Sequence, residues 1–195
     1  MDARTDRSAR VPDLRMTRPS APIVRVVVDD LAFFEGDAIA RPVTADLGST
    51  TSLLRRVELA GGPKLHAQLR TSEPLAVGSA VVTGAGDLPV ELMVHAVVSS
   101  DEQRATAVSV GRATESALQR AGDWQVRRLG IAPFGLGAGN LDAETSAAAM
   151  ADAVRRHTAR AALPDEIVFV TESDDEALTF RSALTRAELR VEEGA

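Results

Sequence analysis

The chain has 195 residues, of which 45% are hydrophobic and 26% are charged, and its formal net charge is −6. This length and composition suit one globular domain with a substantial core, and the acidic balance opposes broad binding to nucleic acid. The absence of cysteine excludes disulfides, a thiol nucleophile and thiolate metal sites, and it is compatible with the reducing cytoplasm, where we expect the protein to act.

The first segment, residues 1–22, is predicted to be a flexible N-terminal tail. It holds five arginines, three aspartates and three prolines with almost no periodic apolar pattern, so it has too little apolar surface to offset the entropy of ordering. We expect a single domain over residues 23–186 and a C-terminal tail over residues 187–195. The longest apolar runs fall far short of the roughly 20 residues that span a bilayer, and no secretory leader is seen, so no membrane contact is predicted.

From Ile23 onward, short β-branched runs alternate with longer helical stretches, which predicts an α/β sandwich. Six strands are expected, at residues 23–28, 37–40, 79–83, 92–98, 129–133 and 166–171. Helices are expected at residues 51–60, 63–70, 103–121, 143–158 and 174–184.

The strongest candidate site follows the fifth expected strand, where residues 131–140 read IAPFGLGAGN. Glycines at every second position, Gly135, Gly137 and Gly139, allow a tight turn and bring bare N–H groups to a ligand. The helix behind them, with Asp142 as its expected N-cap, adds further donors and the positive end of its dipole. We interpret this junction as a phosphate-binding loop, with a turn that is glycine-rich only for tight packing as the alternative.

Several segments, in order, resemble the macro domain, a module that binds ADP-ribose and related nucleotides. The family's first strand, GDIT-type turn and DAIVN strand are similar to VVVDDLAFFEGDAIARP, and its middle strands are similar to VGSAVVTGAGDLPVELMVHAV. Its glycine-rich loop is similar to IAPFGLGAGNL, and its last strand and helix are similar to LPDEIVFVTESDDEALTFRSAL. The resemblance covers about residues 23–184 and implies a three-layer α/β/α sandwich with a mixed, mainly parallel six-stranded sheet.

The resemblance also implies ligand-binding residues. Asp30 matches the acid of the GDIT turn, whose carboxylate accepts a hydrogen bond from the adenine amino group; the alternative is that Asp29 and Asp30 only cap a turn. The residues that match the loop around the distal phosphate and ribose are Gly135, Leu136, Gly137, Ala138, Gly139 and Asn140.

The first ligand loop departs from the family's pattern. Arg41 and Thr44 stand where the family has the two asparagines of its N-A-A-N motif, and Leu54 stands where hydrolytic members place an aspartate. The family's run of glycines is replaced by Thr50, Thr51 and Ser52. Because these side chains add bulk and remove backbone freedom, the ligand is expected to lie further out or to be smaller than ADP-ribose.

These hydroxyl residues also suggest a second contact to an anion. We hypothesise that Thr50 is the N-cap of the helix at residues 51–60, and that the hydroxyl and N–H groups of Thr51 and Ser52 face a phosphate. Arg41 would add a bidentate contact to the same anion. Ordinary capping without any ligand is the alternative.

Catalytic chemistry has little support in the sequence. There is no cysteine and no tyrosine, Leu54 replaces the acid of hydrolytic members, and no paired carboxylates flank the glycine loop. Asp37 and His95 are predicted to be structural, with His95 satisfied by a backbone group, while His66 and His157 are predicted to face solvent. The three histidines lack metal-ligand spacing, so we predict no catalytic residue, metal or cofactor.

Three functions follow from these observations. The first is non-catalytic binding of ADP-ribose or a related nucleotide or phosphate ligand. The second is hydrolysis of ADP-ribosylated or O-acylated ADP-ribose substrates, and the third is a degenerate macro fold that serves as a structural or interaction module. A Rossmann dinucleotide fingerprint fits poorly, because Asn140 stands where that motif needs a glycine.

Overall fold

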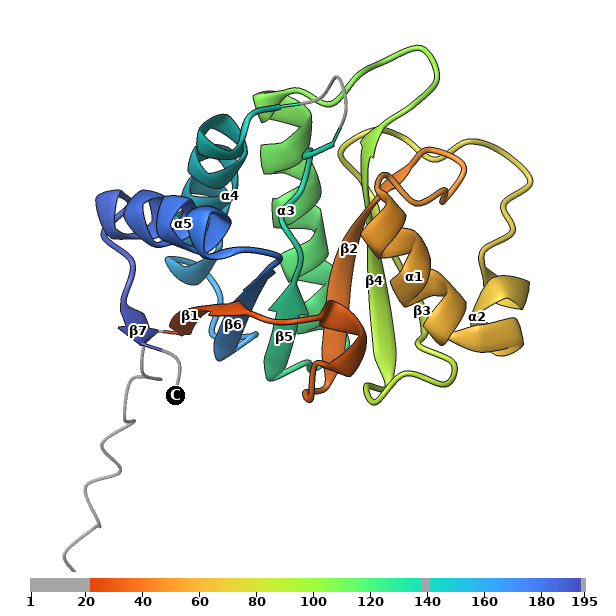
Figure 1. The fold of residues 1–195 in the computed structure, drawn as a ribbon, viewed down its shortest axis with the longest axis horizontal. Helices are drawn as coiled ribbons and strands as arrows, with labels where there is room; N and C mark the ends of the chain where they lie inside the picture. The colour runs from red at the N-terminus through yellow and green to blue at the C-terminus, as the bar shows by residue number, and fades with distance from the viewer. Residues whose placement is uncertain (1–21, 138–140, 194–195) are drawn as a thin grey trace, which may run out of the picture.

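A seven-stranded sheet forms the centre of the computed structural model, which describes residues 22–137 and 141–193 (Figure 1). The strand order is β3-β4-β2-β5-β6-β1-β7, and every neighbouring pair is parallel except β3 and β4. The strands are β1 (Ile23–Val28), β2 (Ala38–Thr44), β3 (Ala80–Gly84), β4 (Leu92–Ser99), β5 (Arg128–Ile131), β6 (Glu166–Thr171) and β7 (Val191–Glu193).

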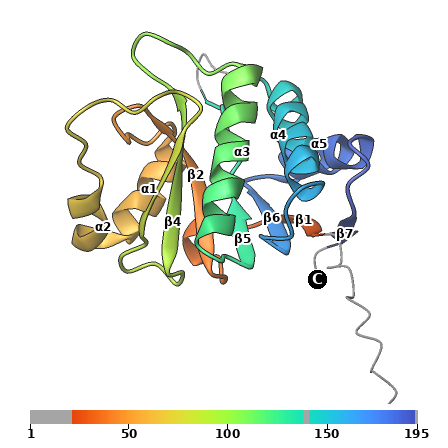
Figure 2. The same cartoon turned by 180° about the vertical axis from the view of Figure 1, so that it is seen from behind.

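Helices cover both faces of this sheet (Figures 1 and 2). They are the 3-10 helix η1 (Leu31–Phe33) and the α-helices α1 (Ser52–Ala60), α2 (Gly62–Gln68), α3 (Ala107–Asp123), α4 (Ala143–Thr158) and α5 (Asp174–Arg186). Helices α3, α4 and α5 pack on one face, and η1, α1 and α2 pack on the other. Among the described residues, no helix is long and apolar enough to cross a bilayer.

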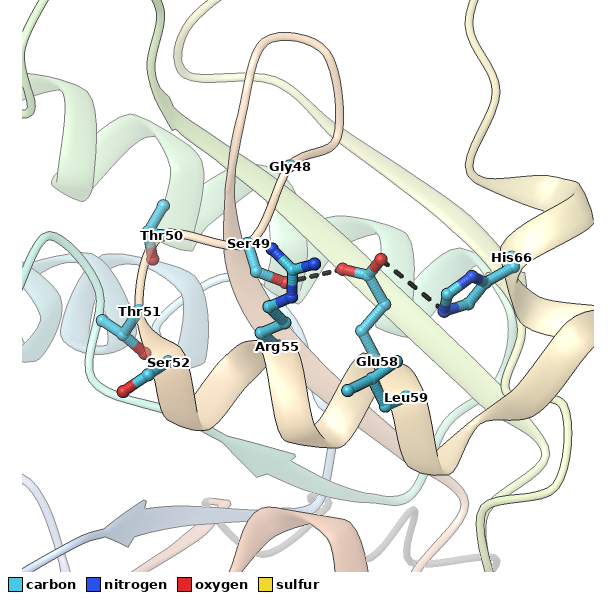
Figure 3. A pocket seen from close by; sticks show the side chains of 9 residues that line it. All are labelled: Gly48, Ser49, Thr50, Thr51, Ser52, Arg55, Glu58, Leu59 and His66. Atoms are coloured by element: carbon cyan, nitrogen blue, oxygen red, sulfur yellow. Dashed lines mark hydrogen bonds and ion pairs between the residues drawn. The ribbon is translucent and has the colours of Figure 1, made fainter.

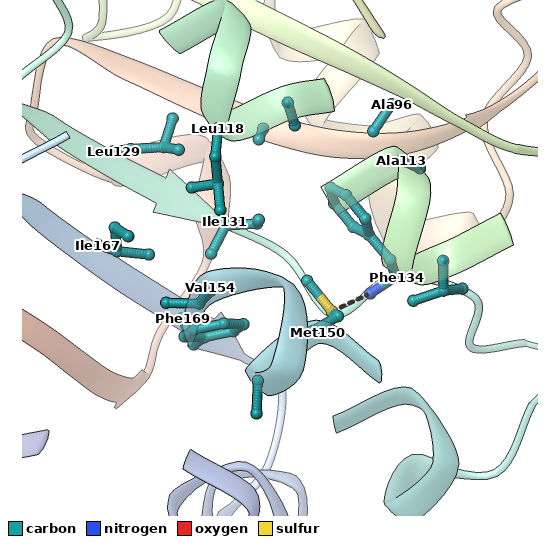
Figure 4. Close-up of a cluster of buried hydrophobic side chains, with 14 of the residues drawn as sticks. Ala96, Ala113, Leu118, Leu129, Ile131, Phe134, Met150, Val154, Ile167 and Phe169 are labelled. Atoms are coloured by element: carbon teal, nitrogen blue, oxygen red, sulfur yellow. Dashed lines mark hydrogen bonds between the residues drawn. The ribbon is translucent and has the colours of Figure 1, made fainter. Parts of the chain in front are cut away.

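The larger core lies between the sheet and helices α3, α4 and α5 (Figure 4). Phe134, Met150 and Phe169 are fully buried there, and the Phe169 ring lies 5.2 Å from that of Phe180 on α5, centroid to centroid. The smaller core on the other face contains Leu54 from α1 and other aliphatic side chains. Each helix thus turns its apolar stripe to the sheet, as amphipathic helices do.

The predicted mixed α/β/α sandwich is confirmed, with seven strands in place of six. The additional strand, β7, pairs in parallel with β1 and lies in the segment that the sequence predicts as a C-terminal tail. Its sequence, VEE, is too short and acidic to carry a periodic signal. Pairing with β1 and an ion pair of 3.0 Å between Arg25 and Glu192 hold it in the sheet.

The helix predicted at residues 103–121 begins four residues later than expected, at Ala107. Thr106 and Ser109 form a reciprocal capping box in which each side chain accepts a hydrogen bond from the other's backbone N–H. This box fixes the start of α3. Most of the predicted tail at residues 1–22 lies outside the described residues.

The topology leaves a crevice at the carboxyl ends of two neighbouring strands. From β2 the chain passes to α1 on one face of the sheet, whereas from the adjacent β5 it passes to α4 on the other face. Ligands of open α/β sheets bind at such switch points, outside the carboxyl ends of the strands. The glycine-rich loop, which follows β5, and the loop with Thr50, Thr51 and Ser52, which follows β2 and which we call the hydroxyl-rich loop, both belong to this edge.

Candidate functional site

The β5–α4 junction (residues 132–142) contains the glycine-rich loop. Gly135 and Gly137 have φ angles of 77° and 118°, a region that glycine adopts readily and other residues rarely. A Cβ atom on Gly135 would lie 2.6 Å from Cγ2 of Val110, so close packing also requires a glycine there. Gly137 is exposed, and the predicted site residues Ala138, Gly139 and Asn140 lie outside the described residues.

Helix α4 begins directly after this loop, and the prediction of Asp142 as its N-cap is confirmed. The Asp142 carboxylate accepts from the backbone N–H of Thr145 at 2.7 Å and from the Thr145 hydroxyl at 2.9 Å. The backbone hydrogen bond, followed by the hydroxyl, lowers the pKa of Asp142. The chain itself therefore satisfies the N–H of Thr145, one of the donors in the first turn of α4.

Asp30 occupies the turn after β1 and caps the short helix η1. Its Oδ1 atom accepts from the backbone N–H of Ala32 at 2.9 Å, and its own N–H donates to the Asp29 carboxylate at 2.7 Å. The turn-capping role that the sequence offers as an alternative for these two aspartates is therefore present. This role still leaves Asp30 at the carboxyl end of β1.

A narrow cleft lies between the two junctions, at the switch point. Its apolar part includes Leu54, Ala132 and Leu136, and its acidic part consists of Asp29, Glu172 and Glu176. The cleft has a volume of only about 40 Å³. Burial, reinforced by the negative charge of Glu176, raises the pKa of Glu172; Arg56 opposes this effect and Asp30 adds to it.

Of the predicted ligand residues, the cleft brings together Thr51 and Leu136. These residues come from different strand-to-helix junctions and from opposite layers of the fold. The acids Glu172 and Glu176 are lining residues that the sequence analysis did not single out. Glu172 directly follows β6, so its place at the carboxyl edge of a parallel sheet was the signal available.

The β2–α1 junction (residues 45–51) contains the hydroxyl-rich loop. Thr51, not Thr50, is the N-cap of α1, with its hydroxyl oxygen accepting from the backbone N–H of Leu54 at 3.3 Å. The Thr50 prediction is wrong by one residue, because Thr51 has the extended backbone that an N-cap requires. Thr44 contributes to the preceding turn: its N–H donates to the carbonyl of Gly48 at 3.0 Å and its hydroxyl donates to Asp46.

Arg41 lies in the protein interior beneath this junction, with no exposed surface. Its Nε atom donates to His95 Nδ1 at 3.1 Å, and Nη1 donates to Ser49 Oγ at 2.8 Å and to Glu58 Oε2 at 2.9 Å. Nη2 donates to the carbonyl of Leu47 at 3.4 Å. The structure therefore places this predicted ligand residue where protein groups occupy its donors.

His95 and Glu58 complete the Arg41 network with opposite charge states. Burial, together with the positive charge of Arg41, lowers the pKa of His95 to about 3, so the ring is neutral and its Nδ1 accepts from Arg41. Burial also favours the neutral form of Glu58, but hydrogen bonds from Ser49 and Arg41 and the charge of Arg41 outweigh it and lower its pKa. A neutral histidine and a charged carboxylate thus face one guanidinium.

His95 is structural, as predicted, but its partners are side chains and not a backbone group. Its Nε2 atom lies 2.8 Å from the hydroxyl of Thr83. Asp37 is structural as well: its Oδ2 atom accepts from the backbone N–H groups of Arg127 and Arg128 at 2.7 and 2.9 Å. His66 is exposed as predicted, whereas His157 is half-buried with its Nε2 atom 2.7 Å from the carbonyl of Leu163.

A second concavity, which we call the outer hollow, lies between the β2–α1 junction and the outward faces of α1 and α2 (Figure 3). Its volume is about 530 Å³. Its lining is mostly polar and consists of Gly48, Ser49, Thr50, Thr51, Ser52, Arg55, Glu58, Leu59 and His66. Thr51 lines both the outer hollow and the cleft, so the N-cap of α1 separates the two.

The polar groups of the outer hollow do not form a hydrolytic triad. Ser49 Oγ donates to Glu58 Oε2 at 2.6 Å, and Glu58 Oε1 lies 3.8 Å from His66 Nε2 (Figure 3). A serine triad needs the histidine between the nucleophile and the acid, whereas here the acid is in the middle. Among the described residues, no group of three or more histidine or acidic side chains could hold a metal ion.

Comparison with known proteins identifies relatives in sequence and in fold. Residues 55–150 match the family described as Macro domain. An uncharacterized protein of Mycobacterium tuberculosis is 29% identical over 159 residues, which are 82% of this chain but only 44% of the relative. The chain therefore spans less than half the length of that relative. An Enterobacter protein named O-acetyl-ADP-ribose deacetylase is 26% identical over 169 residues, or 84% of this chain and 94% of that protein.

The solved structures agree on the fold. The macrodomain of Trypanosoma brucei in complex with ADP-ribose superimposes with a TM-score of 0.73 at 16% sequence identity. The match covers 83% of this chain and 68% of that chain. The resemblance inferred from the sequence motifs is confirmed by the family match and by this shared fold.

Proposed function

We propose that this chain binds ADP-ribose or a related nucleotide or phosphate ligand. It matches the macro-domain family over residues 55–150 and has the macro-domain fold. Its binding site is the cleft, and the glycine-rich loop supplies backbone donors to the phosphate. Binding occurs without catalysis. The observation that carries this proposal is that Thr51 and Leu136, from the two junctions at the switch point, line one cleft.

The groups in and beside the cleft suit both parts of such a ligand. Asp29, Glu172 and Glu176 in the cleft lining offer acceptors for an exocyclic amine. Gly137, which has a positive φ angle, directly follows the cleft residue Leu136 in the chain, and the first turn of α4 comes shortly after it. Donors of this kind bind phosphate groups. The relative from Trypanosoma brucei, whose structure contains ADP-ribose, supports this choice of ligand class.

The cleft has to open for this ligand. Ligand pockets have volumes of about 300–1,000 Å³, far more than the 40 Å³ between the walls here. Leu136 and Leu54 both line the cleft, and we propose that binding moves the Leu136 side away from the N-terminus of α1. Leu54 is buried and has no group that could activate water, which supports binding without hydrolysis.

Calorimetric titration with ADP-ribose tests this proposal on the wild type, Gly137→Glu and Gly137→Ala. The wild type is expected to bind, and Gly137→Glu to weaken binding at least tenfold because its carboxylate repels the phosphate. Gly137→Ala imposes the same backbone strain without the charge, so it should weaken binding less. Equal losses in both variants would assign the effect to backbone geometry. No heat with ADP-ribose, ADP or AMP would overturn the proposal in favour of an interaction module.

Hydrolysis is the second candidate, and two observations favour it. One is the similarity to a protein named O-acetyl-ADP-ribose deacetylase. The other is Glu172, a cleft carboxyl whose pKa is raised by burial and by Glu176, as in a general acid or base. Release of acetate from O-acetyl-ADP-ribose by the wild-type protein would establish this alternative, and its absence with intact binding would support the non-catalytic function.

A further inference from the structure

The acids of the cleft gather on one side of it. Strands β2 and β5, which are neighbours in the sheet, lead to the lining residues Thr51 and Leu136. The next strands across the sheet, β6 and β1, lead to the lining residues Glu172 and Asp29 (Figure 1). The backbone N–H of Asp29 donates to the carbonyl of Thr171 at 3.1 Å, which holds the two acidic turns side by side. The cleft therefore has an acidic side, at β6 and β1, and a side without acids, next to the glycine-rich loop.

Glu172 differs from the other two acids of the lining, because its carboxylate has no protein partner within the described residues. The Asp29 carboxylate accepts from the backbone N–H of Asp30 at 2.7 Å. The Glu176 carboxylate accepts from the backbone N–H of Glu172 at 3.1 Å. The Glu172 side chain itself makes no hydrogen bond or ion pair in the part of the chain that the structure describes. It is also exposed, so a ligand can reach it.

The charges around Glu172 indicate which kind of ligand group suits it. Burial, followed by the negative charge of Glu176, raises its pKa; the charge of Arg56 opposes this effect and Asp30 adds to it. The protein therefore compensates the ionised carboxylate incompletely, and a hydrogen-bond donor from a ligand would stabilise it. A phosphate would be repelled by the same carboxylates. The acidic side of the cleft thus suits the base of a nucleotide and not its phosphates.

Asp30, which the family resemblance assigns to the adenine amino group, does not line the cleft. Its Oδ1 atom caps η1 by accepting from Ala32. Glu172 is therefore the better-placed acceptor for a base. An ionised carboxylate only accepts hydrogen bonds, so it pairs with an amino group and opposes a carbonyl oxygen at the same position. Sites built around one ligand donor reject analogues that lack it.

We propose that Glu172 determines the base specificity of the cleft, and that its carboxylate selects purines with an amino group over purines with a carbonyl at the six-position. The phosphates then lie toward the glycine-rich loop, on the side where the lining carries no acid. This inference rests on the proposed function, because it needs a nucleotide in the cleft. It goes further by assigning the choice of base to one residue, Glu172, in place of Asp30.

Calorimetric titration of the whole chain at pH 8 with ADP-ribose and with its 6-oxo analogue, inosine diphosphate ribose, tests this assignment. The wild type should bind ADP-ribose roughly tenfold or more tightly than the analogue. Glu172→Gln should reduce this preference to about threefold or less, because an amide can accept from an amino group and also donate to a carbonyl. A merely structural role for Glu172 would weaken both ligands equally and leave the ratio of their affinities unchanged.

Asp174→Asn is the matched control for Glu172→Gln. It removes the same charge two residues further along, in the first turn of α5 and outside the cleft lining. The preference for ADP-ribose should therefore stay within about twofold of the wild-type value, since Asp174 does not face the base. Asp30→Asn tests the rival assignment, and it should change the preference less than Glu172→Gln does.

Three outcomes would overturn the inference while the proposed function stands: equal affinity of the wild type for both ligands, an unchanged preference in Glu172→Gln, or the same loss of preference in Asp174→Asn. A larger loss in Asp30→Asn than in Glu172→Gln would assign the choice of base to Asp30 instead. If the wild type bound neither ligand, the proposed function would fall and this inference with it. Binding of both ligands by the wild type thus separates the two failures.

Discussion

A charged network lies beneath the β2–α1 junction, whereas apolar side chains pack beneath the β5–α4 junction. Under the first, Arg41 joins Ser49, Glu58 and His95. Under the second, Phe134 is fully buried, and its backbone N–H donates to the Met150 sulfur at 3.1 Å (Figure 4). Both junctions begin at the end of a parallel strand and end at a side-chain N-cap. The same arrangement of strand, loop and capped helix is therefore stabilised by charged hydrogen bonds in one junction and by apolar packing in the other.

This difference determines what each junction is sensitive to. The β5–α4 junction depends on shape, since Gly135 must leave room for Val110 and must adopt a positive φ angle. The β2–α1 junction depends on charge, since a buried guanidinium is tolerated only while its acceptors remain in place. Substitutions and pH should therefore affect the two junctions differently.

Loss of the Arg41 guanidinium should have the largest effect. Arg41→Met fills much of the same space, but it leaves His95 Nδ1 without its donor and leaves the Glu58 carboxylate without its charged partner, with only the Ser49 hydroxyl as a donor. Removing one partner of a buried pair destabilises a protein by about 3–5 kcal/mol; because Glu58 is partly exposed, we expect about 3 kcal/mol. Urea unfolding measures this loss in the free energy of unfolding.

Arg155→Met is the control for the Arg41 substitution. Arg155 is half-exposed and makes one ion pair of 3.7 Å with Asp152 on the same helix, a type of pair that contributes less than about 1 kcal/mol. A loss in Arg41→Met no larger than in Arg155→Met would contradict the view that the Arg41 network supports the β2–α1 junction.

The sequence predicts those parts of the fold whose signals are local. The bounds of α4 match the prediction at both ends, because Asp142 caps its start and Arg155, Arg156 and His157 lie in its last turn. The glycine-rich loop carries a local signal as well. The shift of the α1 N-cap from Thr50 to Thr51 is an error of one residue, since neighbouring hydroxyl residues are equivalent in the sequence.

The Arg41 network could not be predicted, because its members are far apart in the chain. Arg41 and His95 meet because β2 and β4 are parallel neighbours with these two residues in register. Glu58 joins them only once α1 has packed over the sheet. The sequence offers Arg41 as a ligand contact at the place of the family's asparagine. Only the tertiary structure shows that its donors are used by the protein.

Gly135→Ala should disturb the apolar junction by a smaller amount. The added Cβ atom would lie 2.6 Å from Val110 Cγ2, at a φ angle of 77°. Steric overlap and the left-handed backbone together should reduce the free energy of unfolding by about 2 kcal/mol. Val110→Ala removes the clashing methyl group, so the double variant should recover part of the loss from Gly135→Ala in a double-mutant cycle. No recovery would show that backbone strain alone is responsible.

Between pH 6 and pH 5, acid should weaken the charged junction more than the apolar one. The pKa of His95 is about 3 in the folded protein and about 6.5 in an unfolded chain. The unfolded state therefore binds a proton between these values while the folded state does not. Stability falls as pH decreases through this window and is fully retained above it. For His95 alone, the loss between pH 6 and pH 5 is about 1.2 kcal/mol.

His95→Gln isolates this contribution, because an amide can still accept from Arg41 and pair with Thr83 but does not titrate. Urea unfolding at pH 6 and pH 5 should show a smaller pH-dependent loss in His95→Gln than in the wild type, by about 1 kcal/mol. His157→Gln, which removes a half-buried histidine outside the network, should retain the wild-type difference attributed to His95. The same pH dependence in wild type and His95→Gln would mean that His95 is protonated in the folded protein. Its Nδ1 could then not accept from Arg41, and the charged junction would need a different explanation.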